Sequence, residues 1–134
     1  MEKRGGYYQQ RVETFQDRLY NGEPDLSGRM DKYREETEEA LRLVAGLTAY
    51  QLNKVGEFPN FSRELAGEVV DSIIAGLGVL SVLGHDFREV FEDNMSRAEV
   101  KYDPARIALY EQAGMTRFEA IQRVKSDWNN GIEY

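Results

Sequence analysis

Five acidic side chains occur at spacings that could bring them together from two helices. They form the patterns Glu35-Glu36-x-x-Glu39 and Glu68-x-x-Asp71. At about 100° per residue, the members of each pattern lie on one side of a helix. Carboxylates that converge inside a protein repel one another, and hard divalent cations such as Mg²⁺ relieve this repulsion because they prefer oxygen ligands. The two patterns therefore predict a metal site made of carboxylates.

Both acidic patterns border apolar positions of their own helices. Leu43 and Leu47 share the side of the first pattern, and Glu68 opens an apolar run that extends from Val69 to Leu83. A negative charge at the edge of a buried face is costly unless a cation compensates it. The alternative is that these glutamates simply face solvent, as most glutamates on helices do.

The elements that must position these acids are expected to be helices. No segment alternates between polar and apolar residues with a period of two, so the sequence predicts an all-α protein. Prolines, glycines and capping residues divide the chain. The expected helices are 7–20, 29–54, 62–83 with Ser62 as N-cap, 87–101 with Asp86 as N-cap, 105–112, and a last helix to Trp128 opened by a Thr116-x-x-Glu119 capping box. Four principal helices joined by short turns are typical of a bundle, with the apolar helix buried at its centre.

Composition narrows the class of protein. The chain has 134 residues, which is the length of one domain, and its net charge of -7 argues against general nucleic-acid binding. The absence of cysteine excludes disulfides and thiolate metal sites, and it fits a cytoplasmic protein. The N-terminus lacks an apolar signal segment, and the run from Val69 to Leu83 is short for a bilayer and contains Asp71. We therefore expect a soluble protein with neither membrane nor nucleic acid as partner.

Together the motifs resemble the metal-binding signature of the MazG-like all-α nucleoside triphosphate pyrophosphohydrolases, which include dimeric dUTPases and phosphoribosyl-ATP pyrophosphohydrolase relatives. The resemblance extends over residues 30–102. The segments that carry it beyond the acids are Glu64–Asp71, Gly84–Asp86 and Phe87–Arg97, in this order. It implies a four-helix-bundle core over about residues 7–102, with a C-terminal helical extension over 104–134, in a single domain of residues 1–134. It also implies a homodimer or homotetramer with sites near the subunit interfaces.

The resemblance further implies the chemistry. A nucleoside triphosphate, such as dUTP or another pyrimidine nucleotide, would be cut to its monophosphate and pyrophosphate. Mg²⁺, or Mn²⁺ as a substitute, would be held by Glu35, Glu36, Glu39, Glu68 and Asp71. Bound metal lowers the pKa of water for attack on phosphorus. Glu35 and Glu36 are the expected catalytic residues, with Glu35 the first candidate to orient or deprotonate that water.

A second element of the resemblance concerns the substrate phosphates. Asn94-x-x-Arg97, followed by Lys101-Tyr102, is similar to the Asn-x-x-Lys element of the family, which contacts phosphates. Arg97 stands where relatives often have lysine, so the charge is kept but the hydrogen-bonding geometry differs. The resemblance thus implies that Asn94, Arg97, Lys101 and Tyr102 bind the phosphates. The alternative for Arg97 and Lys101 is a solvated helix end.

The first helix carries side chains that could recognise a base. An aromatic ring such as Phe15 could stack on a base, and a glutamine such as Gln16 could read a pyrimidine edge. The resemblance implies that this helix lines the nucleoside pocket, which makes Phe15 and Gln16 candidates for it. The alternative for Phe15 is a place in the core. His85, the single histidine, is read as structural, and Trp128 as an anchor of the last helix or of an oligomer contact.

Two other functions are compatible with the sequence. A non-catalytic helical interaction protein on the same scaffold would bind metal or nucleotide without turnover. This reading is favoured if the first motif is framed as Glu38-Glu39-x-x-Arg42, which loses one acid. The third option is a structural bundle whose acids face solvent.

Overall fold

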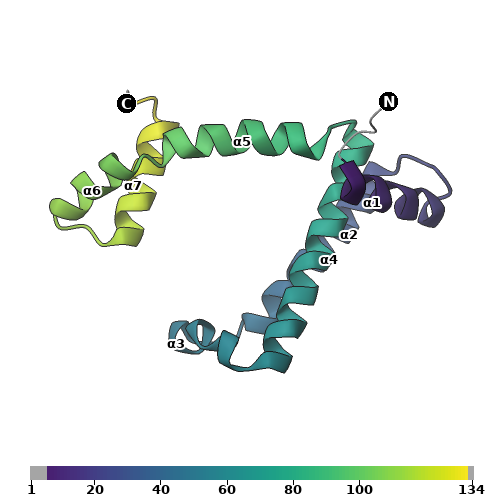
Figure 1. The fold of residues 1–134 in the computed structure, drawn as a ribbon, viewed down its shortest axis with the longest axis horizontal. Coiled ribbons are helices and arrows are strands. Elements are labelled where there is room, and N and C mark those ends of the chain that lie inside the picture. Colours follow the sequence, from purple (N-terminus) through teal and green to yellow (C-terminus); the bar gives the residue numbers. More distant parts are fainter. Residues whose placement is uncertain (1–5, 133–134) are drawn as a thin grey trace. The chain divides into compact units, whose positions relative to one another are not determined.

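The protein is all-helical, as the sequence predicts. The computed structural model describes residues 6–132, and these residues form helices joined by turns, without strands. The elements are α1 Gly6–Leu19, α2 Leu26–Val44, α3 Ala49–Asn53, the 3₁₀ helix η1 Val55–Glu57, α4 Pro59–Leu83, α5 Phe87–Lys101, α6 Pro104–Gln112 and α7 Arg117–Asn129 (Figure 1). The chain divides into two compact units, Met1–Glu89 and Val90–Tyr134. The single domain expected over residues 1–134 stays a prediction.

The first unit is built on α2 and α4, which lie side by side along much of their length (Figure 1). The Tyr33 ring lies against Gly76, where an added Cβ would come within 3.1 Å of the ring. Thr37 Oγ1 and Ser72 Oγ are 3.1 Å apart and share a hydrogen bond. Small and hydroxyl-bearing residues on α4 therefore let the two helices approach closely, and these contacts fix their register.

A buried glutamine joins α1 to the end of α4. Gln9 is only 1% exposed. Its Nε2 donates to the backbone oxygen of His85 at 2.9 Å, and its Oε1 accepts from the Phe87 backbone N–H at 2.8 Å. Helix ends leave backbone groups without intrahelical partners. The Gln9 amide thus satisfies one such group on each side of the turn between α4 and α5.

A second buried glutamine joins α1 to α2. Gln16 Oε1 accepts a hydrogen bond from Arg29 Nη1 at 3.1 Å, and both residues are buried. The Arg29 guanidinium also donates to the Glu23 backbone oxygen and lies over the Tyr20 ring. The amide of Gln16 fills the space beside Gly78. Polar contacts, rather than a large apolar core, hold α1 in place.

The second helix is shorter than the sequence suggested. The helix predicted over residues 29–54 is wrong in its C-terminal part, because α2 ends at Val44 and a separate helix, α3, begins after Thr48. The Thr48 side chain accepts from the Gln51 backbone N–H at 3.2 Å, and the Gln51 side chain accepts from the Thr48 backbone N–H at 2.9 Å. This capping box stabilises a new helix start. The sequence contains the signature of this box, Thr48-x-x-Gln51.

The long helix α4 differs from its expected form in two ways. It begins at Pro59, so Ser62 lies inside the helix and its prediction as N-cap is wrong. Proline suits the first helical position because its φ is fixed and no N–H is needed there. Its end at Gly84 is confirmed, since Gly84 adopts the left-handed conformation with φ 79°.

The apolar helix α4 is not buried within a single chain. Val69, Val70 and Ile73 are 45%, 51% and 53% exposed, so the chain by itself does not bury the apolar helix that the sequence predicts at the centre of a bundle. Apolar composition predicts that a helix needs cover, but it does not say which chain supplies it. By length and composition alone, α4 would also be able to cross a membrane, a property it shares with core helices of soluble proteins.

The second unit contains the helical hairpin of α6 and α7. Its small core is formed by Ile107, Ala120 and Val124. The turn between the helices uses Gly114 at φ 102°, a conformation that favours glycine. The predicted capping box at Thr116 is confirmed, because both of its hydrogen bonds with Glu119 are present.

Candidate metal site

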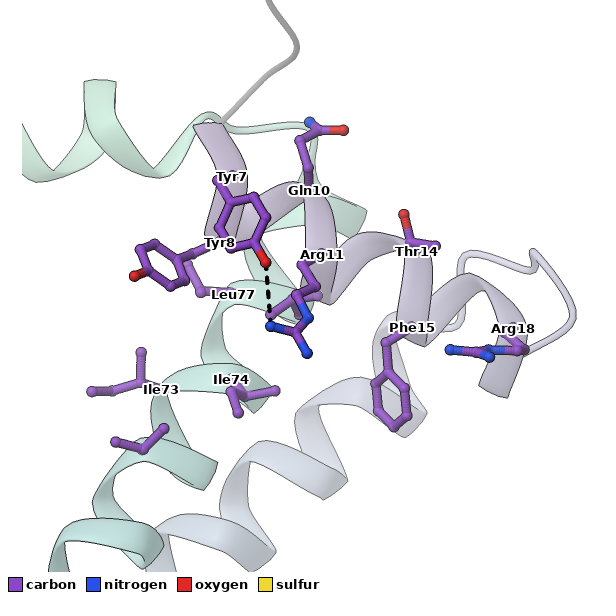
Figure 2. Close-up of a pocket in the computed structure, with 12 residues that line it drawn as sticks. Tyr7, Tyr8, Gln10, Arg11, Thr14, Phe15, Arg18, Ile73, Ile74 and Leu77 are labelled. Atoms are coloured by element: carbon purple, nitrogen blue, oxygen red, sulfur yellow. Dashed lines mark hydrogen bonds between the residues drawn. The ribbon is translucent and has the colours of Figure 1, made fainter.

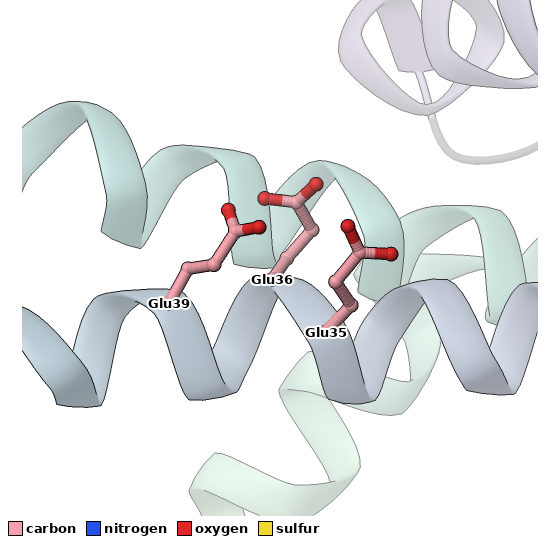
Figure 3. Close-up of side chains that lie close together, drawn as sticks. All are labelled: Glu35, Glu36 and Glu39. Carbon is pink, nitrogen blue, oxygen red and sulfur yellow. The ribbon is translucent and has the colours of Figure 1, made fainter.

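The five acids of the two sequence patterns lie together along the contact between α2 and α4. Ligand oxygens of Glu35, Glu36 and Glu39 lie within 4.8 Å of one another, and so do those of Glu36, Glu68 and Asp71. Figure 3 shows the carboxylates of the first group projecting from one side of α2. Glu36 belongs to both groups. We refer to these five residues as the acid cluster.

The close packing of α2 on α4 is what brings the two patterns together. Thr37 and Ser72, which share a hydrogen bond, directly follow Glu36 and Asp71 in the sequence. This contact holds the two acidic patterns at the same level of the helix pair. Helical periodicity gathers the acids within each helix, and the register of the two helices joins the two sets.

The acid cluster contains more negative charge than its surroundings compensate. The Glu36 side chain is only 12% exposed, whereas that of Glu35 is 56% exposed. Glu68 Oε2 is buried and accepts no hydrogen bond from the residues that the structure describes. The negative charge of Glu36 raises the pKa of Glu39 above its ordinary value of 4.5, and burial and Glu68 add to this effect. A buried carboxylate oxygen without a donor is costly, and a bound cation would satisfy it.

Among the residues that the structure describes, one cation forms ion pairs with the acid cluster. Lys32 Nζ lies 2.9 Å from Glu36 Oε1 and 3.7 Å from Glu35 Oε1. The hydrogen bond to Glu36 is the main cause that raises the pKa of the Lys32 ammonium. Lys32 is not among the residues predicted for the site, although its position one turn before Glu36 is a sufficient signal.

The donor set suits a hard divalent cation. All ligand atoms are carboxylate oxygens, which favour Mg²⁺ or Mn²⁺ over softer metals. Two oxygens bound to one Mg²⁺ at about 2.1 Å each lie at most about 4.2 Å apart. The 4.8 Å spread within each group is therefore close to a ligating arrangement and needs only small side-chain rotations. Because the two groups share Glu36, they could hold two ions bridged by one carboxylate.

The residues expected to bind phosphates belong to the second unit. Asn94, Arg97 and Lys101 lie on α5, and Tyr102 follows its end. The Arg97 guanidinium donates to the side-chain oxygen of Asn94, and Lys101 Nζ lies 5.4 Å from the centre of the Tyr102 ring. Their spacing places Asn94, Arg97 and Lys101 on one side of the helix. Their role at the acid cluster stays a prediction.

The two candidates for the nucleoside pocket face different surroundings. Phe15 is 48% exposed and borders an open groove of about 920 Å³ between α1 and α4. Figure 2 shows Tyr7, Tyr8 and Arg11 around the same groove. Gln16 is 4% exposed, and its amide oxygen is occupied by Arg29. The structure therefore places Phe15 on an accessible apolar surface and Gln16 in the interior.

Comparison of the chain with protein-family models, with curated protein sequences and with solved structures found no match. The resemblance to MazG-like enzymes thus stays a prediction, and the acid cluster between α2 and α4 is the feature on which a function can be proposed.

Proposed function

We propose that the chain is a Mg²⁺-dependent nucleoside triphosphate pyrophosphohydrolase of the MazG-like type. One observation carries this proposal: carboxylates from α2 and α4 converge through the shared Glu36, with a buried oxygen of Glu68 that lacks a donor among the described residues. A structural role would have surrounded these acids with arginine, lysine or backbone N–H donors. The order of the sequence motifs supports the same chemistry.

The proposed mechanism assigns a role to each acid. When bound, Mg²⁺ or Mn²⁺ neutralises phosphate charge and lowers the pKa of the water that attacks the α-phosphorus. Glu36 holds both halves of the site together because it belongs to both groups. Glu35 is the more exposed of the two catalytic candidates, so it is better placed to orient or accept a proton from that water. Glu39, Glu68 and Asp71 complete the ligand set.

The remaining candidates would bind the nucleotide. In this proposal, Arg97 and Lys101 supply positive charge to the outer phosphates, and Asn94 and Tyr102 supply hydrogen bonds. Phe15 is the better placed of the two nucleoside candidates because its ring is accessible. Gln16 would have to give up its bond to Arg29 before it could read a base.

The assembly we propose is a homodimer or homotetramer, in which a second copy covers the exposed side of α4 and completes a four-helix bundle. Val69, Val70 and Ile73 are each about half exposed, which is unfavourable in water. A membrane is a poorer cover, because the helix that carries these residues also carries Glu68 and Asp71, and charges in hydrocarbon are costly. We accordingly propose a soluble, cytoplasmic protein without nucleic-acid partners. Sedimentation equilibrium should give the mass of two or four chains, and a monomer would contradict this assembly.

The experiment that tests the activity measures pyrophosphate release from a panel of nucleoside triphosphates with Mg²⁺. We expect release from at least one pyrimidine nucleotide and a loss of at least about 100-fold in Glu68→Gln. Glu64→Gln is the matched control, because Glu64 is exposed one turn earlier on the same helix and lies outside the acid cluster. Circular dichroism verifies that both variants are folded.

Two results would contradict the proposed activity. Thermal stabilisation by Mg²⁺ and nucleotide without any release would identify a non-catalytic nucleotide-binding protein. Equal activity of Glu68→Gln and the unmodified protein would show that the acid cluster does not carry the reaction.

A further inference from the structure

Lys32 is a cation that contacts the acid cluster. Its Nζ lies 2.9 Å from Glu36 Oε1, and Glu36 is the carboxylate shared by both groups of ligands. The Lys32 side chain is 43% exposed, whereas that of Glu36 is 12% exposed. A mobile surface cation therefore reaches inward to a more buried acid.

Local helix energetics alone do not account for this contact. In an isolated helix, a lysine four residues before a glutamate is the less favourable order of the pair. The neighbouring carboxylates change the balance, since Glu35 Oε1 also lies within 3.7 Å of Lys32 Nζ. The accumulated negative charge of the acid cluster is what draws the ammonium inward.

A divalent ion bound to Glu36 and the Lys32 ammonium would compete for the negative charge of the same carboxylate. An ion bound to Glu36 Oε1 would lie about 2.1 Å from it. With Nζ at 2.9 Å from the same atom, the two cations would lie close enough to repel each other. Lysine has a long flexible stem, so Nζ can swing into the solvent that already surrounds part of it.

We propose that Lys32 is a positioning residue that acts as the internal counter-ion of Glu36 and is displaced when a divalent cation binds. Lys32 thereby sets the concentration of divalent cation at which the acid cluster fills. This inference rests on the proposed metal site and describes how that site is regulated. It also gives the acid cluster a way to persist without metal, since one of its charges is then neutralised within the chain.

The test is calorimetric titration of the full chain with Mn²⁺ in the absence of nucleotide. Lys32→Met removes the competing cation, so we expect Mn²⁺ to bind about two- to fivefold more tightly, the range expected for loss of a partly exposed ion pair. Lys32→Gln should tighten binding in the same way, and Lys32→Arg, which keeps the charge, should retain the original affinity.

Lys54→Met is the matched control. Lys54 has the same 43% side-chain exposure, and it pairs with Glu57 at 3.7 Å, outside the acid cluster. Its substitution should leave Mn²⁺ affinity unchanged. A second readout is thermal unfolding: without metal, Lys32→Met should unfold at a lower temperature than Lys54→Met, and Mn²⁺ should abolish this difference.

Failure of the proposed role of Lys32 and failure of the proposed metal site would give different results. Unchanged or weaker Mn²⁺ binding in the neutral Lys32 variants would overturn the role of Lys32 while leaving the metal site in place. If the unmodified protein and Glu68→Gln show the same Mn²⁺ binding, or none, both the metal site and the role of Lys32 are overturned.

Discussion

Two nearly buried carboxylates in this protein have opposite surroundings. Asp127, on α7, is 7% exposed, and its carboxylate accepts hydrogen bonds from three side chains. The Tyr110 hydroxyl donates to it, Arg123 Nε lies at 3.2 Å and Arg106 Nη2 at 3.4 Å. The hydrogen bond from Tyr110 is the main cause that lowers its pKa below 3.8. Asp127 therefore links α7 to α6 as a fully compensated charge.

Glu36, on α2, has a similarly small exposure but is met mostly by other acids. Four carboxylates share its two groups of ligand oxygens, and within residues 6–132 Lys32 is the one cation that forms an ion pair with it. Its charge raises the pKa of the neighbouring Glu39. The difference teaches that burial alone does not distinguish a structural acid such as Asp127 from a proposed metal ligand such as Glu36. The sign of the neighbouring charges does.

The largest expected effect is on metal affinity, which should distinguish Glu36 from Asp127. Glu36→Gln removes the carboxylate shared by both groups, so we expect Mn²⁺ affinity to fall by at least about 100-fold. Asp127→Asn should leave the affinity unchanged. Titration calorimetry of both variants measures this difference. Similar losses in the two variants would mean that metal binding depends on general folding rather than on the acid cluster.

Sequence reasoning found the acid cluster because much of it is encoded locally. The spacing of Glu35, Glu36 and Glu39 determines their common side on any helix. The meeting of Glu36 with Glu68 is different, because it depends on how α2 packs on α4. That register comes from contacts such as Tyr33 against Gly76. A periodic pattern in the sequence does not predict such contacts between helices.

The same limit explains the errors in the fold. Helix ends with a strong local signal, such as Gly84 and the capping box at Thr116, were predicted and are confirmed. The break after Val44 was missed because its signal, the capping box at Thr48, is weaker than the helical composition around it. The donors to Asp127 were not foreseen, since Tyr110 and Arg106 reach it from another helix.

A second prediction concerns stability. Asp127→Asn leaves the Tyr110 hydroxyl and the Arg123 guanidinium without their charged acceptor, and we expect the unfolding temperature to fall by roughly 5 °C or more. Thermal unfolding followed by circular dichroism measures the change. Asp93→Asn, at an exposed position of α5, is the control and should change little. Mn²⁺ should not rescue Asp127→Asn, because this acid is not a ligand; rescue would contradict the comparison.

The two acids should also respond to pH with opposite signs. Between 4.5 and its raised pKa, Glu39 binds more protons in the folded state, so its contribution to metal-free stability falls as pH rises. Asp127 has a lowered pKa, so its contribution is present above 3.8 and is lost as pH falls through its folded pKa.

Chemical denaturation across acidic pH, without metal, separates these contributions. Glu39→Gln should remove the loss of stability that occurs as the pH rises above 4.5. Asp127→Asn should remove part of the loss of stability that occurs as the pH falls below 3.8. The same protons compete with metal, so Mn²⁺ affinity should begin to fall at a higher pH than an ordinary glutamate would give. A pH profile that neither substitution alters would rule out these assignments.

The smallest expected effect compares the two capping boxes, one in each unit. Thr48 and Thr116 make the same pair of hydrogen bonds, but the third helical residue is neutral Gln51 in the first box and charged Glu119 in the second. Replacing either threonine with alanine should cost about 1 kcal/mol at neutral pH. The backbone N–H of Thr116 is the main cause that lowers the pKa of Glu119 below 4.5.

Lowering the pH should therefore weaken the capping box at Thr116 and leave the one at Thr48 unchanged. The backbone N–H of residue 116 is kept in Thr116→Ala, but the Thr116 hydroxyl, which also lowers the pKa of Glu119, is removed. The stabilisation from this hydroxyl is present above 4.5 and is lost as pH falls through the lowered pKa, so the cost of Thr116→Ala should shrink in acid. The cost of Thr48→Ala should stay constant, because Gln51 does not titrate. Urea denaturation of both variants at neutral and acidic pH measures the two costs. If both costs shrink equally, the carboxylate of Glu119 adds nothing to its cap. The influence of neighbouring charges on this fold would then be smaller than the contrast between Asp127 and Glu36 implies.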